Sequence, residues 1–200
     1  MTDFADVVRR RRMTRAFASA PVEPALIDEM VELAARAPSA GKTQGWHLVV
    51  LEGPDTARFW DITMPAERRA GFRWQQLLQA PVIALPFADP DAYVERYSEP
   101  DKERTGLGAG RAAWPVPYWT VDASMAVMTL LLAAEDHGLG ALFFGVFRGE
   151  PALRAELGVP EELELLGAVA IGHRAEGEQS GRSAARSRRS PAEIIHRGGW

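Results

Sequence analysis

The chain has 200 residues, and 46% of them are hydrophobic, which is enough for one sizeable core. Acidic residues outnumber basic residues by 27 to 23, and the net charge of -4 argues against a dedicated nucleic-acid-binding protein. The sequence has no cysteine, which excludes disulfides, thiolate metal sites and cysteine nucleophiles and makes a cytoplasmic protein the expectation.

In the first half of the chain, hydrophobic residues recur at helical spacing between short apolar runs typical of strands. Thr2 is expected to cap the first helix, and Pro38 to end the second. The expected elements are helices at 3–12, 24–37, 55–62 and 66–78 and strands at 47–51 and 81–86, the last bounded by prolines.

Residues 87–118 are the least regular part, because they mix prolines and glycines with aromatic side chains. We interpret them as a long loop or lid with short helical turns, since long loops in compact domains are usually functional or mobile. A disordered surface insertion is the alternative, although aromatic residues are scarce in disordered segments.

The second half predicts a helix at 120–137, which is apolar nearly all round and therefore belongs in the middle of a fold or of a dimer. A strand at 141–147, a short helix at 151–157 and a last strand at 165–171 complete the body. The tail from 173 to 189 is rich in Gly, Ser, Glu and Arg and is expected to form an arm. Helices alternating with single strands predict an α/β or α+β layer protein.

No segment predicts a membrane protein or a secretory signal. The longest apolar run, 123–134, is interrupted by Ser124 and Thr129 and is too short to span a bilayer. The N-terminal arginines are not followed by an apolar stretch of the kind that a signal peptide needs.

Arginine is concentrated near the start of the chain, at positions 9–12 and 15. Such a run repels itself and favours an anionic partner, and the forked guanidinium suits a phosphate. A solvated helix end, with cations near the helix C-terminus, is the alternative. The tail carries a second basic cluster from Arg182 onward.

Other motifs are incomplete. Gly41-Lys42-Thr43 resembles the end of a phosphate-binding loop, but Arg36 stands where the first glycine is needed and a helix precedes the segment instead of a strand. The glycines of 106–110 and 138–140 do not complete a dinucleotide fingerprint. The four histidines show no metal-ligand spacing, and no serine lies in a Gly-x-Ser-x-Gly context.

Four segments in order resemble the nitroreductase family. They are the arginine segment at 11–17, the loop at 37–46, the central helix at 122–134 with Gly138, Gly140 and Gly145 after it, and the final strand at 170–173 together with 188–191. The resemblance covers nearly the whole chain except residues 54–118.

This resemblance implies an α+β fold, a three-layer α/β/α sandwich with a mostly antiparallel central sheet. It implies a single domain over 1–200, with a lid-like insertion at about 87–118 and a C-terminal arm at about 173–200. The family resemblance further implies a homodimer with FMN at the interface, NADH or NADPH as donor, and a nitroaromatic or quinone as acceptor in a ping-pong reaction. No nucleic acid or membrane partner is implied.

The resemblance also assigns residues to the cofactor. Arg11 and Arg189 would hold the FMN phosphate, with Arg12, Met13 and Arg188 beside them, and Arg15 would face the N1/O2 edge of the ring. The remaining cofactor contacts are Pro38, Ser39, Lys42, Gln44, Phe144 and Gly145, and the acceptor pocket would use Tyr97, Trp114, Tyr118 and Trp119. No side chain stands out as a catalytic acid or base, which fits chemistry carried by the flavin.

Several positions depart from the family pattern. Met13 replaces a common serine, Lys42 an asparagine and Gly45 a proline, so polar contacts to the flavin are expected to be fewer. Two alternatives within the fold stay open: a flavin-binding protein with another reaction, such as flavin cleavage or dehalogenation, and a protein that only sequesters FMN. A small anion-binding or nucleic-acid-binding module would leave the loop at 38–46 unexplained.

Overall fold

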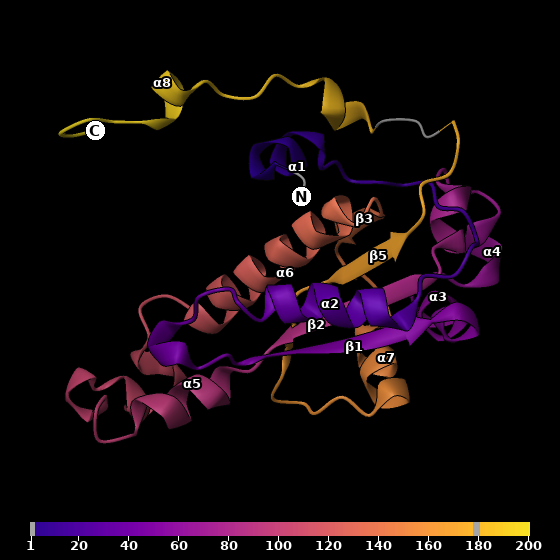
Figure 1. Cartoon of the computed structure of the whole chain (residues 1–200). Helices are drawn as coiled ribbons and strands as arrows, with labels where there is room; N and C mark the ends of the chain where they lie inside the picture. Colours follow the sequence, from indigo (N-terminus) through magenta and orange to yellow (C-terminus); the bar gives the residue numbers. More distant parts are fainter. Residues whose placement is uncertain (1–2, 178–180) are drawn as a thin grey trace.

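The computed structural model describes residues 3–177 and 181–200 and shows an antiparallel sheet covered by helices on both faces (Figure 1). The strands are β1 (Trp46–Glu52), β2 (Val82–Ala88), β3 (Gly140–Phe144), β4 (Glu164–Leu165) and β5 (Ala168–Gly172). Their order is β1-β2-β5-β3, and β4 pairs with the end of β2. All these pairings are antiparallel.

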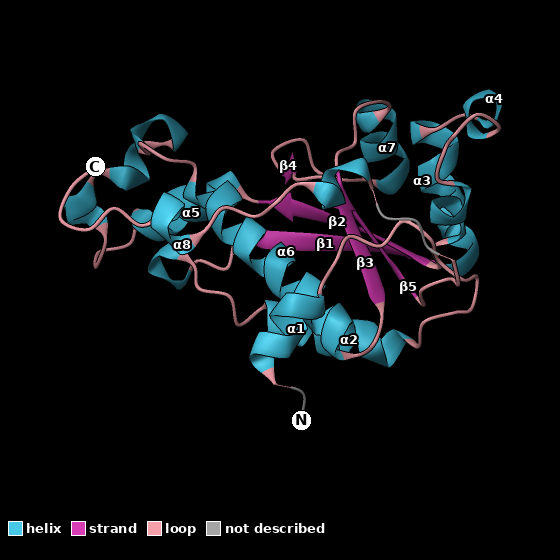
Figure 2. Cartoon of the chain, turned by 90° about the horizontal axis from the view of Figure 1, so that it is seen from above, coloured by secondary structure: helices cyan, strands magenta, loops and turns pink. Residues whose placement is uncertain are grey.

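Helices form a layer on each side of the sheet, as the view from above shows (Figure 2). α1 (Phe4–Arg10), α2 (Pro24–Ala34) and α6 (Tyr118–Asp136) lie on one side, and α3 (Thr56–Thr63) and α7 (Glu150–Leu157) lie on the other. Three short helices complete the set: α4 (Ala66–Arg69), α5 (Pro90–Tyr97) and α8 (Pro191–Ile194). The predicted α+β fold with three layers is confirmed.

Strand β2 shows why both layers are needed, because all its residues are buried. Val82 and Ala84 pack into the core under α2 and α6, whereas the alternate residues Ile83 and Leu85 pack toward α3 and α7. Each large side chain buried in this way contributes about 1.5–3 kcal/mol. A strand that is buried on both faces consists of consecutive apolar residues, and residues 82–88 form such a run.

Pro86 lies inside β2, although the sequence predicted that it bounds the strand. Its carbonyl accepts a hydrogen bond from the backbone N–H of Leu166 at 3.0 Å, so its nitrogen faces the same side of β2. On that side the partner changes from β5 to β4 near Gly167, whose φ is +146°. The position at which proline lacks an N–H therefore faces the gap between the hydrogen bonds to β5 and those to β4. The strand predicted at 165–171 is accordingly two strands, β4 and β5.

Two other expectations need correction. The helix predicted at 66–78 is only α4 followed by a 3-10 turn at Gln75–Gln79, because the Gln75 side chain donates to the carbonyls of Arg69 and Phe72. The predicted lid contains the regular helix α5, which begins with Pro90 and is capped by the Asp89 side chain. The expected cap Thr2 lies outside the described residues, and Asp3 caps α1 by accepting from the N–H of Ala5 at 2.8 Å.

The C-terminal segment leaves the sheet after β5 and runs past α1 (Figure 1). Ala18 donates to the carbonyl of His173 and Ala175 donates to that of Ala16, so the segment is attached to the body at its start. From 184 onward its residues are exposed. Among the described helices, none is both long and apolar enough to cross a membrane.

Candidate functional site

The arginine segment is fixed along the outer edge of β3. Met13 forms a parallel bridge with Ala141, and the N–H of Thr14 donates to the Ala141 carbonyl at 2.9 Å. Thr14 is fully buried, and a Cβ at Gly140 would lie only 2.7 Å from its Cγ2. Gly140 therefore lets the segment approach closely, and Arg11 to Arg15 receive a defined position beside the sheet.

Arg11 is half-buried and has an unusual environment. Its Nη1 is buried without a hydrogen-bond partner among the described residues. A buried donor without an acceptor costs free energy, and an anionic oxygen would supply the strongest compensation. Arg9, by contrast, is exposed and pairs with Asp6 at 3.2 Å, so the solvated-helix interpretation describes Arg9 but not Arg11.

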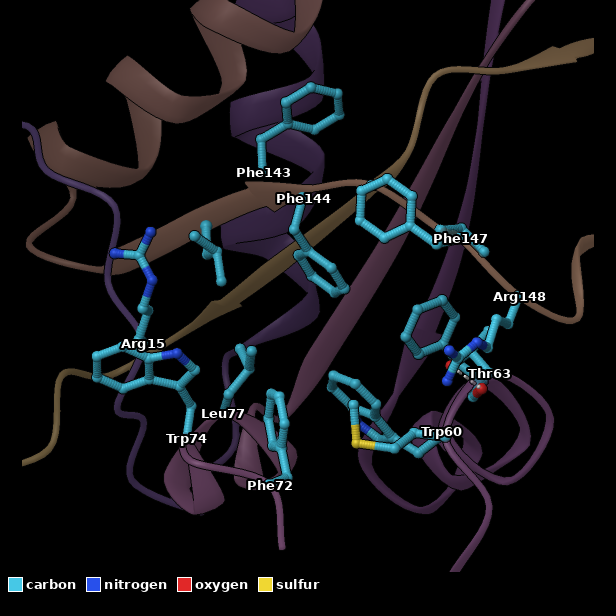
Figure 3. A pocket seen from close by; sticks show the side chains of 15 residues that line it. Arg15, Trp60, Thr63, Phe72, Trp74, Leu77, Phe143, Phe144, Phe147 and Arg148 are labelled. Atoms are coloured by element: carbon cyan, nitrogen blue, oxygen red, sulfur yellow. Dashed lines mark hydrogen bonds between the residues drawn. The ribbon is translucent and has the colours of Figure 1, made fainter. Parts of the chain in front are cut away.

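Arg15 lines a cavity of about 510 Å³ between β3, α3 and the segment after α4 (Figure 3). Its guanidinium lies 5.6 Å from the centroid of the Trp74 ring and donates to the carbonyl of Met13 at 3.1 Å. The walls are mostly apolar and include seven aromatic side chains, among which Trp60 and Phe144 stack with 6.0 Å between centroids and 5° between planes. The cavity therefore suits a flat, largely apolar ring system.

Phe144 and Gly145 line the same cavity as Arg15. A Cβ at Gly145 would lie 2.7 Å from the ring of Phe147, which is itself 93% exposed. Glycine thus allows the Phe147 ring to approach the backbone just after β3. The structure brings together three of the residues that the sequence assigned to the cofactor.

The loop at 38–44 lies outside the lining of this cavity. Lys42 and Gln44 both adopt left-handed backbone conformations, with φ of 57° and 56°, which cost about 1–2 kcal/mol each for non-glycine residues. Ser39 holds the turn, because its Oγ accepts from the N–H of Gln44 at 2.9 Å. Pro38, Lys42 and Gln44 are exposed, so their side chains are available to a ligand or a second subunit.

A buried carboxylate supports this loop from behind. Oδ2 of Asp122 on α6 accepts from the N–H of Ala40 at 2.7 Å and from the hydroxyl of Tyr93 at 2.8 Å. Burial, followed by the hydrogen bond to Asp122, raises the pKa of Tyr93 well above its usual range. Tyr93 therefore stays neutral and remains a donor.

The four residues predicted for the acceptor pocket, Tyr97, Trp114, Tyr118 and Trp119, form a separate aromatic cluster around Tyr93. Trp114 and Trp119 are buried, and the indole N–H of Trp119 donates to Glu164 at 2.9 Å. This end of the molecule, around α5, is opposite to the end that holds α3 and α4 (Figure 2). Within one chain these residues do not line the cavity of Arg15, and their role stays a prediction.

The predicted phosphate ligands Arg188 and Arg189 are exposed on the tail, where Arg189 donates to the carbonyl of Glu193. Arg12 is exposed and Met13 half-buried on the segment beside β3. The sequence analysis missed the cavity walls Trp60, Phe72 and Trp74. The close spacing of aromatic residues at 59–60 and 72–74 was the available signal. Among the described residues, no group of His, Asp and Glu could hold a metal ion.

Known proteins resemble this chain over most of its length. The model of the family described as "Nitroreductase family" matches residues 8–173. The chain belongs to the nitroreductase family. An NADH dehydrogenase of Thermus thermophilus is 30% identical over 181 residues, which cover 84% of each chain.

Two further proteins similar to this chain are informative. A 4-nitrobenzoate reductase of a Nocardioides species is 26% identical over 197 residues, covering 85% of this chain and 80% of the relative. The crystal structure of a nitroreductase-type protein of Desulfovibrio desulfuricans in complex with FMN is 25% identical, with a TM-score of 0.68. The alignment with that structure covers 98% of this chain and 96% of the other.

Proposed function

We propose that this protein is an FMN-dependent oxidoreductase that takes hydride from NADH or NADPH and reduces a second small acceptor of the nitroaromatic or quinone type. The observation that carries the proposal is the convergence of Arg15, Phe144 and Gly145 on one aromatic cavity. Membership of the nitroreductase family and the FMN bound to the Desulfovibrio relative support it.

The residues fit an FMN. Nη1 of Arg11, which is buried and has no partner in the described part of the chain, is a donor suited to the phosphate, and Arg188 and Arg189 on the tail would supply further cations. Arg12 and Met13 continue the same segment. Pro38, Ser39, Lys42 and Gln44 would contact the ribityl chain or the ring. When bound, FMN supplies the hydride and electron transfer chemistry.

The protein's own groups would set the conditions for that chemistry. The guanidinium of Arg15 would stabilise negative charge at the N1/O2 edge of the ring, because a fixed cation in an apolar cavity needs little reorganisation. The backbone N–H of Gly145 would face N5, and the stacked rings of Trp60 and Phe144 would exclude water from one side. Protons would come from water, since no Asp, Glu or His is among the described residues that line the cavity.

The outer face of α6 supports the proposal of a homodimer. Tyr118, Val121, Met125 and Met128 recur at spacings of three and four residues, which places them on one face, and each is 36–41% exposed. Phe4 and Val8 on the adjacent α1 extend this apolar surface. A second copy would cover it and would bring the 38–44 loop, and the aromatic cluster at Tyr97 and Trp114, toward the partner's cavity.

The test is a steady-state assay with FMN, NADH or NADPH, and a nitroaromatic or quinone acceptor. Because donor and acceptor would use one site in turn, double-reciprocal plots at several acceptor concentrations should give parallel lines. Intersecting lines would contradict the ping-pong order. A yellow protein that turns over neither acceptor would favour the sequestering alternative over the oxidoreductase.

A further inference from the structure

We propose that Arg148 binds the anionic substituent of an aromatic acceptor, so that the cavity selects acceptors whose ring carries a carboxylate. This inference rests on the proposed oxidoreductase function and names the substrate class of the same cavity. It assigns acceptor specificity to Arg148 at one end of the cavity, whereas Arg15 at the other end would face the flavin ring.

The charged side chains among the described residues that line the cavity are all positive. Arg15 and Arg148 are the charged side chains among its described lining residues, and no carboxylate is among them. The two arginines lie at opposite ends, with Phe144, Phe72 and Trp60 between them (Figure 3). If Arg15 serves the edge of the flavin ring, Arg148 is the cation left for a second ligand.

Neighbouring carboxylates do not neutralise Arg148. The acidic residues of α3 and α7 are engaged elsewhere: Asp61 with Arg69, Glu150 with Arg154 and Glu156 with Arg58. Arg148 itself makes no hydrogen bond or ion pair with any residue that the structure describes. An exposed arginine at the edge of an apolar cavity, with its neighbours already paired, is suited to a ligand anion.

The backbone that carries Arg148 is held in place. Gly149 has a φ of +73°, and a Cβ there would lie 2.8 Å from the carbonyl oxygen of Ile62 at the end of α3. The loop between β3 and α7 therefore packs tightly against α3. This fixes the position from which the Arg148 side chain reaches the cavity.

The chemistry of the cavity identifies the class of ligand. Phe147 is 93% exposed beside Arg148, and Trp60 and Phe72 line the cavity between the two arginines, so a benzenoid ring would find aromatic partners next to Arg148. A guanidinium binds a carboxylate through two parallel hydrogen bonds. An acceptor with a ring and a carboxylate at its far end would use both features at once, with its reducible group toward the flavin.

The experiment compares two acceptors of nearly equal shape, 4-nitrobenzoate and the neutral 4-nitrobenzamide. The ratio of their kcat/KM values should favour the anion in the wild-type protein and should fall by about tenfold in Arg148→Gln. Arg148→Lys should keep an intermediate ratio, because it retains the charge but loses the fork. Arg104→Gln, which removes an exposed arginine from the 3-10 turn at Glu103–Thr105, is the control and should leave the ratio unchanged.

A binding measurement separates this inference from the proposed function. Benzoate, which cannot be reduced, should quench the tryptophan fluorescence of the wild-type protein at lower concentration than benzamide, and Arg148→Gln should abolish that difference. If neither nitro compound is turned over but the benzoate effect depends on Arg148, the oxidoreductase proposal fails and the anion site stands.

Two results would overturn the Arg148 proposal. One is an acceptor ratio that Arg148→Gln does not change, together with equal binding of benzoate and benzamide. The other is a rise in KM for NADPH but not for NADH in Arg148→Gln at an unchanged acceptor ratio, which would assign Arg148 to the phosphate of the donor.

Discussion

The carboxylate of Asp122, on the central helix α6, accepts a hydrogen bond of 2.7 Å from the backbone N–H of Ala40, 82 residues earlier in the chain. The same oxygen accepts from the Tyr93 hydroxyl, and Asp122 is only 6% exposed. One buried charge thus joins the central helix, the insertion and the loop that carries Ser39, Lys42 and Gln44. The bond to Ala40 fixes the backbone two residues before Lys42, the first of the two non-glycine residues of the loop with a left-handed backbone.

Replacing Asp122 tests this role. Asp122→Leu leaves the Ala40 N–H and the Tyr93 hydroxyl without an acceptor, and we expect the free energy of unfolding to fall by about 2–4 kcal/mol. Asp122→Asn keeps an acceptor oxygen and should lose less. Urea denaturation of both variants gives the comparison, and FMN titration should show the same order of affinities. An equal fall in the free energy of unfolding in the two variants would contradict a stabilising role for the acceptor oxygen.

Arg11 is expected to bind the FMN phosphate. Arg11→Met should raise the Kd for FMN by about 10- to 100-fold, because a charge-assisted pair with the phosphate is lost. The apo protein should be no less stable, since the substitution removes a buried donor that has no partner among the described residues. Fluorescence titration and thermal unfolding measure the two effects. Arg9→Met, at an exposed position two residues earlier in α1, is the control, and an equal loss of affinity there would contradict the assignment.

Arg15 is expected to act on flavin reduction more than on flavin binding. In Arg15→Ala the rate of anaerobic reduction by NADH should fall by about 10- to 100-fold, whereas the Kd for FMN should change less. Arg73→Ala is a matched control, because the Arg73 guanidinium also lies over the Trp74 ring, at 4.6 Å, but does not line the cavity. Unchanged reduction kinetics in Arg15→Ala would remove the basis for placing the flavin ring beside it.

The apolar face of α6 should be covered by a second subunit. Met125→Glu places a charge in the middle of this face, and we expect a dimer-to-monomer shift together with weaker FMN binding. Ala155→Glu, on the exposed side of α7 across the sheet, should leave the molecular mass unchanged. Light scattering after gel filtration measures both variants. A wild-type protein that is monomeric at micromolar concentration would contradict the dimer.

The sequence predicted correctly those helices and strands whose own hydrophobic pattern determines their structure. The central helix is apolar nearly all round and lies in the core as expected, and 82–85 is buried from both sides. Helix ends that depend on hydrogen bonds from side chains to the backbone were missed, because such hydrogen bonds leave no periodic pattern in the sequence. The Gln75 amide ends the expected helix at 66–78, and the Asp89 cap begins a helix inside the predicted lid.

The resemblance assigned Arg15, Phe144 and Gly145 to one ligand, and the structure brings these three residues together around one cavity. The opposite wall comes from α3 and the segment after α4, which lie within residues 54–118, where none of the motifs that carry the resemblance is found. Long-range packing determines which of their aromatic residues face β3, and hydrophobic periodicity alone does not show that. The same limit explains why Arg148 could not be distinguished from other exposed arginines.

The most direct test of the account is the visible absorption spectrum of the purified protein, with FMN added if it is colourless, followed by anaerobic NADH and NADPH. The account predicts a bound-flavin spectrum that one or both nucleotides bleach and that a nitroaromatic or quinone acceptor restores. A protein that does not bind FMN would contradict it, and Arg11 and Arg15 would then serve another anion within a nitroreductase fold.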